Sequence, residues 1–279
     1  INPVNTTETA GQVLRWNLAG TPLNALPSQG EVTSISFNPN GSTIALAENA
    51  SSTQIVNNNQ VPVRQFSGQI SLWQFTGQKL QTFAAHDDRI TSVRYSPNGQ
   101  FLASGSWDNT VKLWTADGKP LKTLTGHTGQ VTNVQFSPDG KTIASTSYDT
   151  TIKLWNLDGK ELKTLKGHTS TVTSVGFSQD GEKLISASSD GNIKLWDFKR
   201  GSVLANLKRN SSTVNSVVFS PDGTIVASAN ADQTIVLWNF NLNDVLQRGC
   251  QWLQDYLRNN PSISPDVHSL CNAVNDPRH

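Results

Sequence analysis

The stretch GHTGQVTNVQFSPDGKTIASTSYDTTIKLW, residues 126–155, decides the fold, because close copies of it precede and follow it along the chain. Each copy ends in a tryptophan. Three consecutive gaps between these tryptophans are 41 residues long, the last gap is 42, and the first, 57, is one period plus an insertion of 16. The tryptophans are Trp16, Trp73, Trp114, Trp155, Trp196 and Trp238. A fixed period of this length predicts an array of one repeated structural unit.

Each period contains four short segments with strand character. In the quoted copy, VTNVQF, TIASTS and TIKLW are three of them, and LKTLKG follows the tryptophan as the fourth. The SPDG motif between the first two has Pro and Gly where a type I turn prefers them. One small antiparallel sheet cannot bury both of its faces, whereas copies stacked around an axis can. We therefore predict an all-β fold of the β-propeller type.

The recurring elements Gly-His, S-P-D-G, S-x-S-x-D and L-W resemble the WD40 repeat. The resemblance extends over residues 10–240, although only Trp196-Asp197 keeps the literal Trp-Asp pair. In this family each blade holds a buried, hydrogen-bonded set of His, Ser, Asp and Trp. The resemblance implies three complete tetrads: His86, Ser104, Asp108 and Trp114; His127, Ser145, Asp149 and Trp155; His168, Ser186, Asp190 and Trp196.

A Ser, a His and an Asp together also suggest a hydrolase triad, but a triad occurs once and exposes its nucleophile. Here the set occurs three times, each time with a tryptophan, which favours a structural role in satisfying buried polar groups. The histidines are one period apart and have no Cys or second His at zinc-ligand spacing. We therefore expect no catalytic residues, no metal and no cofactor.

The period is broken in two places. In the blade ending at Trp73, the tetrad positions hold Ser28, Leu46 and Ala50, so the tetrad is predicted to be lost. The same blade contains the polar insertion, residues 50–66, which we interpret as either a tolerated surface loop or a loop that contacts a partner. In the last blade, Asn210 replaces the histidine.

The face that presents the Asp turns is the predicted partner-binding surface. Exposed aromatic and arginine side chains are frequent anchors of interfaces, and two aromatics precede tetrad aspartates in adjacent blades. An alternative is that both rings lie flat over their own blades. The candidate residues are Asp87, Asp88, Arg89, Trp107, Tyr148, Ser189, Lys208 and Arg209.

Composition excludes some classes of partner. With 22 basic and 21 acidic residues, the chain has no general attraction for nucleic acids or anionic membranes. No apolar run is long enough to span a bilayer. The lysines on alternate strand positions are interpreted as protection of strand edges rather than as a binding patch; they are Lys112, Lys122, Lys153, Lys163 and Lys194. We expect a cytoplasmic protein in which Cys250 and Cys271 are either reduced or joined in one bond.

After the last repeat the pattern changes. Apolar residues from 242 to 257 recur at helical spacing, and Pro261 ends the run. We predict two domains, a propeller over 1–240 and a helical extension over 241–279. The stretch RGCQWLQDYLRNNP, residues 248–261, is similar to tails of cyanobacterial multidomain WD40 proteins, many of which have an upstream signalling NTPase module.

The array contains about five and a half four-stranded blades, whereas seven is the commonest number in the family. The chain also contains no methionine and begins within a repeat. We therefore expect an N-terminally incomplete ring from a longer or processed chain. The favoured function is a protein-interaction scaffold, as the sensor or binding module of a larger bacterial signalling protein. A self-assembling structural module that uses the C-terminal helices is the alternative, and an enzyme using the central pore is the least favoured.

Overall fold

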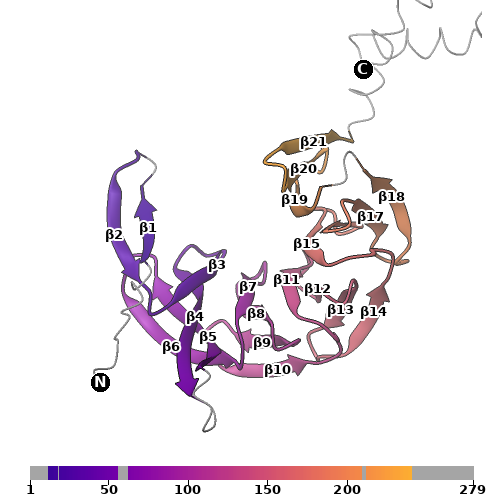
Figure 1. The fold of residues 1–279 in the computed structure, drawn as a ribbon. Coiled ribbons are helices and arrows are strands. Elements are labelled where there is room, and N and C mark those ends of the chain that lie inside the picture. The colour runs from indigo at the N-terminus through magenta and orange to yellow at the C-terminus, as the bar shows by residue number, and fades with distance from the viewer. Residues whose placement is uncertain (1–11, 18, 56–61, 209–211, 241–279) are drawn as a thin grey trace, which may run out of the picture.

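The computed structural model describes residues 12–17, 19–55, 62–208 and 212–240. All regular secondary structure within these residues is β-strand, as the sequence predicts. The strands form antiparallel sheets that follow one another around an open arc (Figure 1). The first sheet is a hairpin of β1 (Gln12–Trp16) and β2 (Pro22–Pro27).

Five further sheets follow, which we call blades 1 to 5 in chain order. Blade 1 consists of β3 (Glu31–Phe37), β4 (Thr43–Ile55), β5 (Pro62–Gln74) and β6 (Lys79–His86). Blade 2 consists of β7 (Ile90–Tyr95), β8 (Phe101–Ser106), β9 (Val111–Thr115) and β10 (Pro120–Leu124). Blade 3 consists of β11 (Val131–Phe136), β12 (Thr142–Ser147), β13 (Ile152–Asn156) and β14 (Glu161–Leu165).

Blade 4 consists of β15 (Val172–Phe177), β16 (Lys183–Ser188), β17 (Ile193–Asp197) and β18 (Val203–Leu207). Blade 5 has three described strands, β19 (Val214–Phe219), β20 (Ile225–Asn230) and β21 (Ile235–Asn239). In each blade the strands pair in chain order. The first strand of each blade lies on the inside of the arc, and the fourth strand of blades 1 to 4 lies on the outside (Figure 1).

The SPDG motif makes the turn between the first two strands of a blade. In blade 3 the Gly140 amide donates to the Ser137 carbonyl at 2.8 Å, and Gly140 has a φ of +69°. The Asp139 carboxylate accepts hydrogen bonds from the Ser137 hydroxyl and the Lys141 amide. Glycine is favoured at this position because side chains on L-residues are strained at positive φ.

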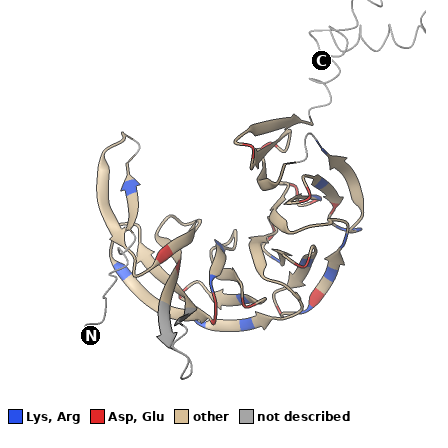
Figure 2. Cartoon of the chain, viewed as in Figure 1, with Lys and Arg blue, Asp and Glu red and all other residues tan. Residues whose placement is uncertain are grey.

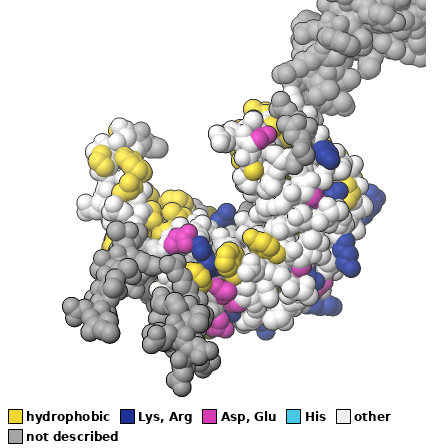
Figure 3. All heavy atoms as spheres, viewed as in Figure 1, with side chains coloured by type: hydrophobic (Ala, Val, Ile, Leu, Met, Phe, Trp, Pro, Cys, Tyr) yellow, Lys and Arg dark blue, Asp and Glu magenta, His cyan; other side chains and the backbone are white. Residues whose placement is uncertain are grey.

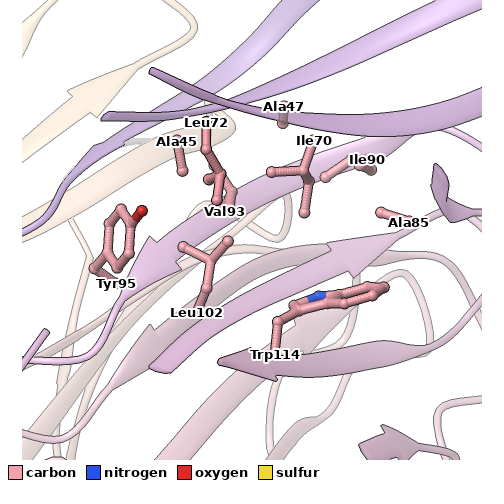
Figure 4. Packing of buried hydrophobic residues seen from close by; sticks show 10 residues of the cluster. All are labelled: Ala45, Ala47, Ile70, Leu72, Ala85, Ile90, Val93, Tyr95, Leu102 and Trp114. Carbon is pink, nitrogen blue, oxygen red and sulfur yellow. The ribbon is translucent and has the colours of Figure 1, made fainter. Parts of the chain in front are cut away.

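The hydrophobic core lies between neighbouring blades rather than within one sheet. Figure 4 shows one such layer, in which Ile70 and Leu72 of blade 1 pack toward Val93 and Leu102 of blade 2, with Trp114 at its edge. Equivalent clusters fill the seams between the later blades. Burial of both sheet faces by the neighbours is the physical reason that a single repeat cannot fold alone.

The repeat also provides one hydrogen bond across each seam between blades. A threonine hydroxyl near the start of the first strand donates to a backbone carbonyl at the start of the next blade. The pairs are Thr33 to Ile90, Thr91 to Val131, Thr132 to Val172 and Thr173 to Val214. These bonds fix the blades in register along the arc.

The interpretation of the lysines as edge protection holds only in part. Lys122 and Lys163 lie on β10 and β14, the outer strands along which charged residues are visible in Figure 2. The other three lysines lie on the third strands, where edge protection is not needed. Lys112 Nζ instead donates to the Ala85 carbonyl at 2.7 Å, and Lys153 Nζ lies 2.8 Å from Glu161 Oε2.

Several sequence predictions fall outside the part of the chain that the structure describes. These are the helical extension over 241–279, the pairing of Cys250 with Cys271, and the environments of Arg209 and Asn210. The number of blades in the complete ring likewise stays a prediction.

Candidate interaction surface

One face of the arc presents two kinds of loop that lie against each other; we call it the loop face. The loops entering each first strand meet the turns that contain the tetrad aspartates. The turn amide donates to the loop carbonyl in every blade from 2 to 5, at 2.8–2.9 Å. The donor and acceptor pairs are Trp107 and Arg89, Tyr148 and Gln130, Ser189 and Thr171, and Ala231 and Thr213.

The three tetrads form as the family resemblance implies. In blade 3, Trp155 Nε1 donates to Ser145 Oγ at 2.8 Å, and the same oxygen lies 2.8 Å from His127 Nε2. The other imidazole nitrogen, Nδ1, lies 2.7 Å from Asp149 Oδ2. Blades 2 and 4 repeat this geometry within 0.2 Å. Each chain of bonds runs from the buried indole outward to an aspartate at the loop face.

The tetrads of blades 3 and 4 contain neutral histidines and ionised aspartates at neutral pH. Burial lowers the pKa of His127 and His168, and the neighbouring carboxylates offset only part of this effect. Burial by itself raises the pKa of Asp190, but hydrogen bonds from the Thr169 amide and from His168 outweigh it and lower the pKa to about 2. The pKa of Asp149 is lowered in the same way. Each of these tetrads therefore places one uncompensated negative charge near the loop face.

The seryl hydroxyls of the tetrads are unsuited to nucleophilic chemistry. Ser104, Ser145 and Ser186 are fully buried, and each is engaged by both an indole and an imidazole. A hydrolase nucleophile must instead reach a substrate in a cleft. Among the described residues, no group of three or more His, Cys, Asp or Glu side chains is placed to hold a metal ion.

Blade 1 lacks the tetrad, as predicted, and a different buried relay takes its place. Trp73 Nε1 donates to Ser71 Oγ at 2.9 Å, and Ser71 Oγ donates to Glu48 Oε1 at 2.6 Å. Glu48 is 2% exposed and Ser71 is fully buried. The sequence alignment missed this relay because Ser71 comes from the tryptophan strand itself, not from the preceding strand. A glutamate in an otherwise apolar stretch of β4 was the available signal.

Blade 5 retains only the inner part of the tetrad in the described residues. Trp238 Nε1 donates to Ser228 Oγ at 3.1 Å. Trp238 is half-buried, in contrast to the nearly inaccessible tryptophans of blades 3 and 4. Lys208, a predicted contact residue, is exposed just after β18. Within the described residues it makes no hydrogen bond or ion pair with another candidate contact residue.

Arg89 is the centre of the best-formed cluster on the loop face. Its guanidinium carbon lies 5.0 Å from the ring centroid of Trp107 and 5.3 Å from that of Phe66. Its Nη2 also pairs with the carboxylate of Glu31 in blade 1. Two cation–π contacts and an ion pair hold the side chain across the seam between blades 1 and 2. The sequence singled out Arg89 and Trp107, but not Phe66 or Glu31, which contact them only through the tertiary fold.

The insertion in blade 1 is not a loop over most of its length. β4 and β5 extend through it as paired strands, with Ile55 opposite Pro62. Asn49 anchors the base of this hairpin, because its side chain exchanges two hydrogen bonds with the backbone of Ile90. A Cβ at Gly68 would lie 2.6 Å from the Asp88 carbonyl oxygen, so only glycine permits this approach. The base of the hairpin is therefore held against blade 2 by contacts with its backbone.

The two predicted aromatics differ in their environments. Trp107 is half-buried beside Arg89. Tyr148 is 52% exposed. Asp87 is exposed, whereas Asp88 and Ser189 are half-buried.

Thr150, two residues after Tyr148, is β-branched yet has a φ of +70°, which is a strained backbone conformation.

Acidic and hydrophobic side chains lie side by side on the visible face near the middle of the arc, while Lys and Arg gather along the outer rim (Figure 3). Over the described residues, no helix has the length and hydropathy required to cross a bilayer. The fold and the loop face together define a repeat protein of the β-propeller class.

Comparison with known families identifies the repeat. The family model described as "WD domain, G-beta repeat" matches residues 77–115, 118–156, 159–197 and 201–239, more than half of the chain. The chain therefore belongs to the WD40 repeat family. Members of this family are generally non-enzymatic scaffolds for protein–protein interaction, and the repeats indicate that role here.

Curated relatives match over short stretches. The Periodic tryptophan protein 2 homolog of Schizosaccharomyces pombe is 46% identical over 48 residues, which are 17% of this chain and 6% of that protein. An uncharacterized WD repeat-containing protein of Synechocystis sp., slr0143, is 43% identical over 37 residues, 13% of this chain and 3% of that protein. The match therefore spans only a small part of the length of these relatives, about the size of one repeat.

Proposed function

We propose that this chain is a binding module that holds a protein or peptide partner on its loop face, with no catalytic role. The observation that supports this most directly is the fixed cluster of Arg89, Trp107 and the inserted hairpin. A rigid, partly apolar surface loses little conformational entropy on binding, which favours affinity. Aromatic and arginine side chains also supply most of the binding energy at protein interfaces.

The other candidate residues extend this surface along the arc. Tyr148 offers an exposed ring in blade 3, and Asp87 and Asp88 add carboxylates beside the Arg89 cluster. Ser189, Lys208 and Arg209 belong to the proposal by their repeat positions. The surface carries more acid than base, so nucleic acid and anionic membranes are disfavoured as partners.

The wider biological setting is also part of the proposal. The tail motif over 248–261 and the similarity of one repeat to a Synechocystis protein support a module of a larger bacterial signalling protein located in the cytoplasm. A ring completed to seven blades would give the loop face a closed circumference. Self-assembly through the extension over 241–279 is the second candidate, supported by the apolar helical periodicity of that segment.

Affinity capture with matched variants tests the loop-face proposal. The wild-type chain, Trp107→Ala with Tyr148→Ala, and a deletion of residues 50–66 would be compared with the rim variant Leu162→Ala. Leu162 is 49% exposed on β14, away from the loop face, so its substitution controls for general loss of apolar surface. We expect partners to be lost with the loop-face variants and kept with the rim variant. Retention of every partner by both loop-face variants would refute the proposal.

A further inference from the structure

The repeat places the same pair of positions side by side in every blade, one in the loop before the first strand and one in the aspartate turn. In blade 2 these positions hold Arg89 and Trp107, joined by a backbone hydrogen bond of 2.9 Å. In blade 3 the equivalent positions are Gln130 and Tyr148, joined by an equivalent bond of 2.9 Å. The backbone geometry is therefore matched, while the cation of blade 2 is replaced by a neutral amide.

In blade 2 the side chains at these two positions contact each other. The Arg89 guanidinium lies over the Trp107 ring and leaves that tryptophan half-buried. In blade 3 the Tyr148 ring is 52% exposed, and no cation–π or ring–ring contact of the described residues involves it. Tyr148 is thus an aromatic platform of the same kind without the cation that covers its counterpart.

The turn that presents Tyr148 is firmly held. A Cβ at Gly129 would lie 2.9 Å from the Asp149 amide nitrogen and 3.3 Å from Tyr148 Cβ, so the loop and turn are in direct contact. Asp149 itself is fixed by His127 and by the Thr128 and Thr151 amides. The ring is therefore displayed from a rigid base, which reduces the entropy lost when a partner covers it.

Acidic side chains on the loop face of blades 2 and 3 favour a cation. The tetrad carboxylates Asp108 and Asp149 are 13% and 9% exposed at their side chains and reach the loop face. Asp87 and Asp88 add two carboxylates from the neighbouring loop. Two positive groups of blades 2 and 3 are engaged within the molecule: Arg89 pairs with Glu31, and Lys153 of β13 pairs with Glu161 of β14.

We propose that Tyr148 receives an arginine side chain from a basic peptide segment of the partner, which takes the place that Arg89 occupies over Trp107 within the chain. Arginine is favoured over lysine because its planar guanidinium stacks on aromatic rings and is more weakly hydrated. This inference rests on the proposed function of the loop face and specifies the chemistry of the partner at one of its positions.

The test uses four short peptides, acetyl-Gly-Xaa-Gly-amide with Xaa as arginine, lysine, citrulline or glutamate, titrated into the whole chain. The ring resonances of ¹³C-labelled tyrosine report on binding; the chain has three tyrosines, and the Tyr148→Phe spectrum assigns the relevant one. We expect the Tyr148 signals to shift most with arginine. The dissociation constant of the neutral citrulline peptide should be about two- to fivefold larger than that of the arginine peptide, which is the range for an exposed cation–π contact.

The substitution Gln130→Arg supplies the missing cation from within the chain. It should cover the ring, shift the Tyr148 signals without any peptide, and weaken arginine-peptide binding by about threefold or more. The matched control is Thr171→Arg, which places the same charge at the equivalent position of blade 4 beside Ser189, where there is no ring. The control should leave arginine-peptide binding at Tyr148 within about twofold of wild type, since it removes no aromatic contact.

The possible outcomes separate this inference from the proposed function. Equal shifts with arginine and citrulline, or unchanged binding in Gln130→Arg, would overturn the assignment of an arginine to Tyr148. If natural partners still depended on Trp107 and the hairpin, the loop-face function would stand without it. Conversely, selective arginine binding at Tyr148 would support the inference even if the deletion of residues 50–66 left partner binding intact.

Discussion

Replacing Ser145 by alanine should destabilise blade 3 by about 3 kcal/mol. Ser145 Oγ lies at the centre of the tetrad, 2.8 Å from both Trp155 Nε1 and His127 Nε2. Ser145 is fully buried and Trp155 is 1% exposed, so water cannot replace the lost partner. Each buried group left without a hydrogen bond costs about 1–3 kcal/mol, and the substitution leaves two such groups.

Ser228→Ala in blade 5 is the matched control. There the hydroxyl accepts from Trp238 Nε1 at 3.1 Å, and the indole is half-buried, so solvent can take over part of the bond. We expect a loss of about 1 kcal/mol. Urea unfolding followed by circular dichroism gives the overall loss, and hydrogen exchange of residues 142–156 localises it to blade 3. A Ser145→Ala variant as stable as Ser228→Ala would refute the reasoning that the tetrad is a stability device.

Three further predictions concern local features. At the left-handed turn positions, Thr150→Asn should stabilise the chain by about 1 kcal/mol and Asn109→Thr should destabilise it by about the same amount. The reason is that asparagine tolerates a φ near +70° and threonine does not. Urea midpoints that move in the opposite directions would contradict this. Gly68→Ala should cost about 1–3 kcal/mol, because its Cβ would lie 2.6 Å from the Asp88 carbonyl oxygen. Gly176→Ala, whose Cβ would lie 3.5 Å from Ile185 Cγ2, should be nearly neutral by the same measurement. Acidification should lower the urea midpoint in two steps. Because His127 and His168 have folded pKa values below the ordinary 6.5, their contribution to the free energy of unfolding is present above that pH and is lost as the pH falls below it. The lowered pKa of Asp190 adds a second loss of stability as the pH falls from about 4 to about 2. A urea midpoint that stays constant between about pH 7 and about pH 5 would contradict the first step.

The all-β architecture was predictable because the same strand segments and turn motifs recur in every period. The tetrads were predictable through the resemblance to the WD40 repeat, which implied the role of the Ser, Asp and Trp that recur at a fixed spacing. The blade ending at Trp73 lacks the tetrad, as predicted, but the relay that replaces it was not predicted from the sequence. The Ser and Asp positions of the tetrad hold Leu46 and Ala50 in this blade. Ser71 and Glu48 form the relay to the indole from other positions of the same sheet.

The loop face shows the opposite case. The sequence marked Arg89, Trp107 and Tyr148 by residue type and repeat position, but it could not tell which ring would be covered. That outcome depends on Phe66 and Glu31, which approach Arg89 from a different blade. The inserted segment was expected to be a loop because its composition is polar. In the structure it continues β4 and β5 as a hairpin, which is stabilised by strand pairing and by contacts of Asn49 with Ile90.

The sequence by itself therefore determined the strands and their turns, because these depend on spacing within one period, and its resemblance to the WD40 repeat implied the family and the three regular tetrads. The tertiary structure decided which side chains meet: the Glu48 relay within blade 1, the contacts of the inserted hairpin with blade 2, and the contrast between a covered Trp107 and an open Tyr148. The physical reason is that contacts between blades depend on how rigid sheets stack, and a single period of sequence contains no record of which residues its neighbour will bring into contact.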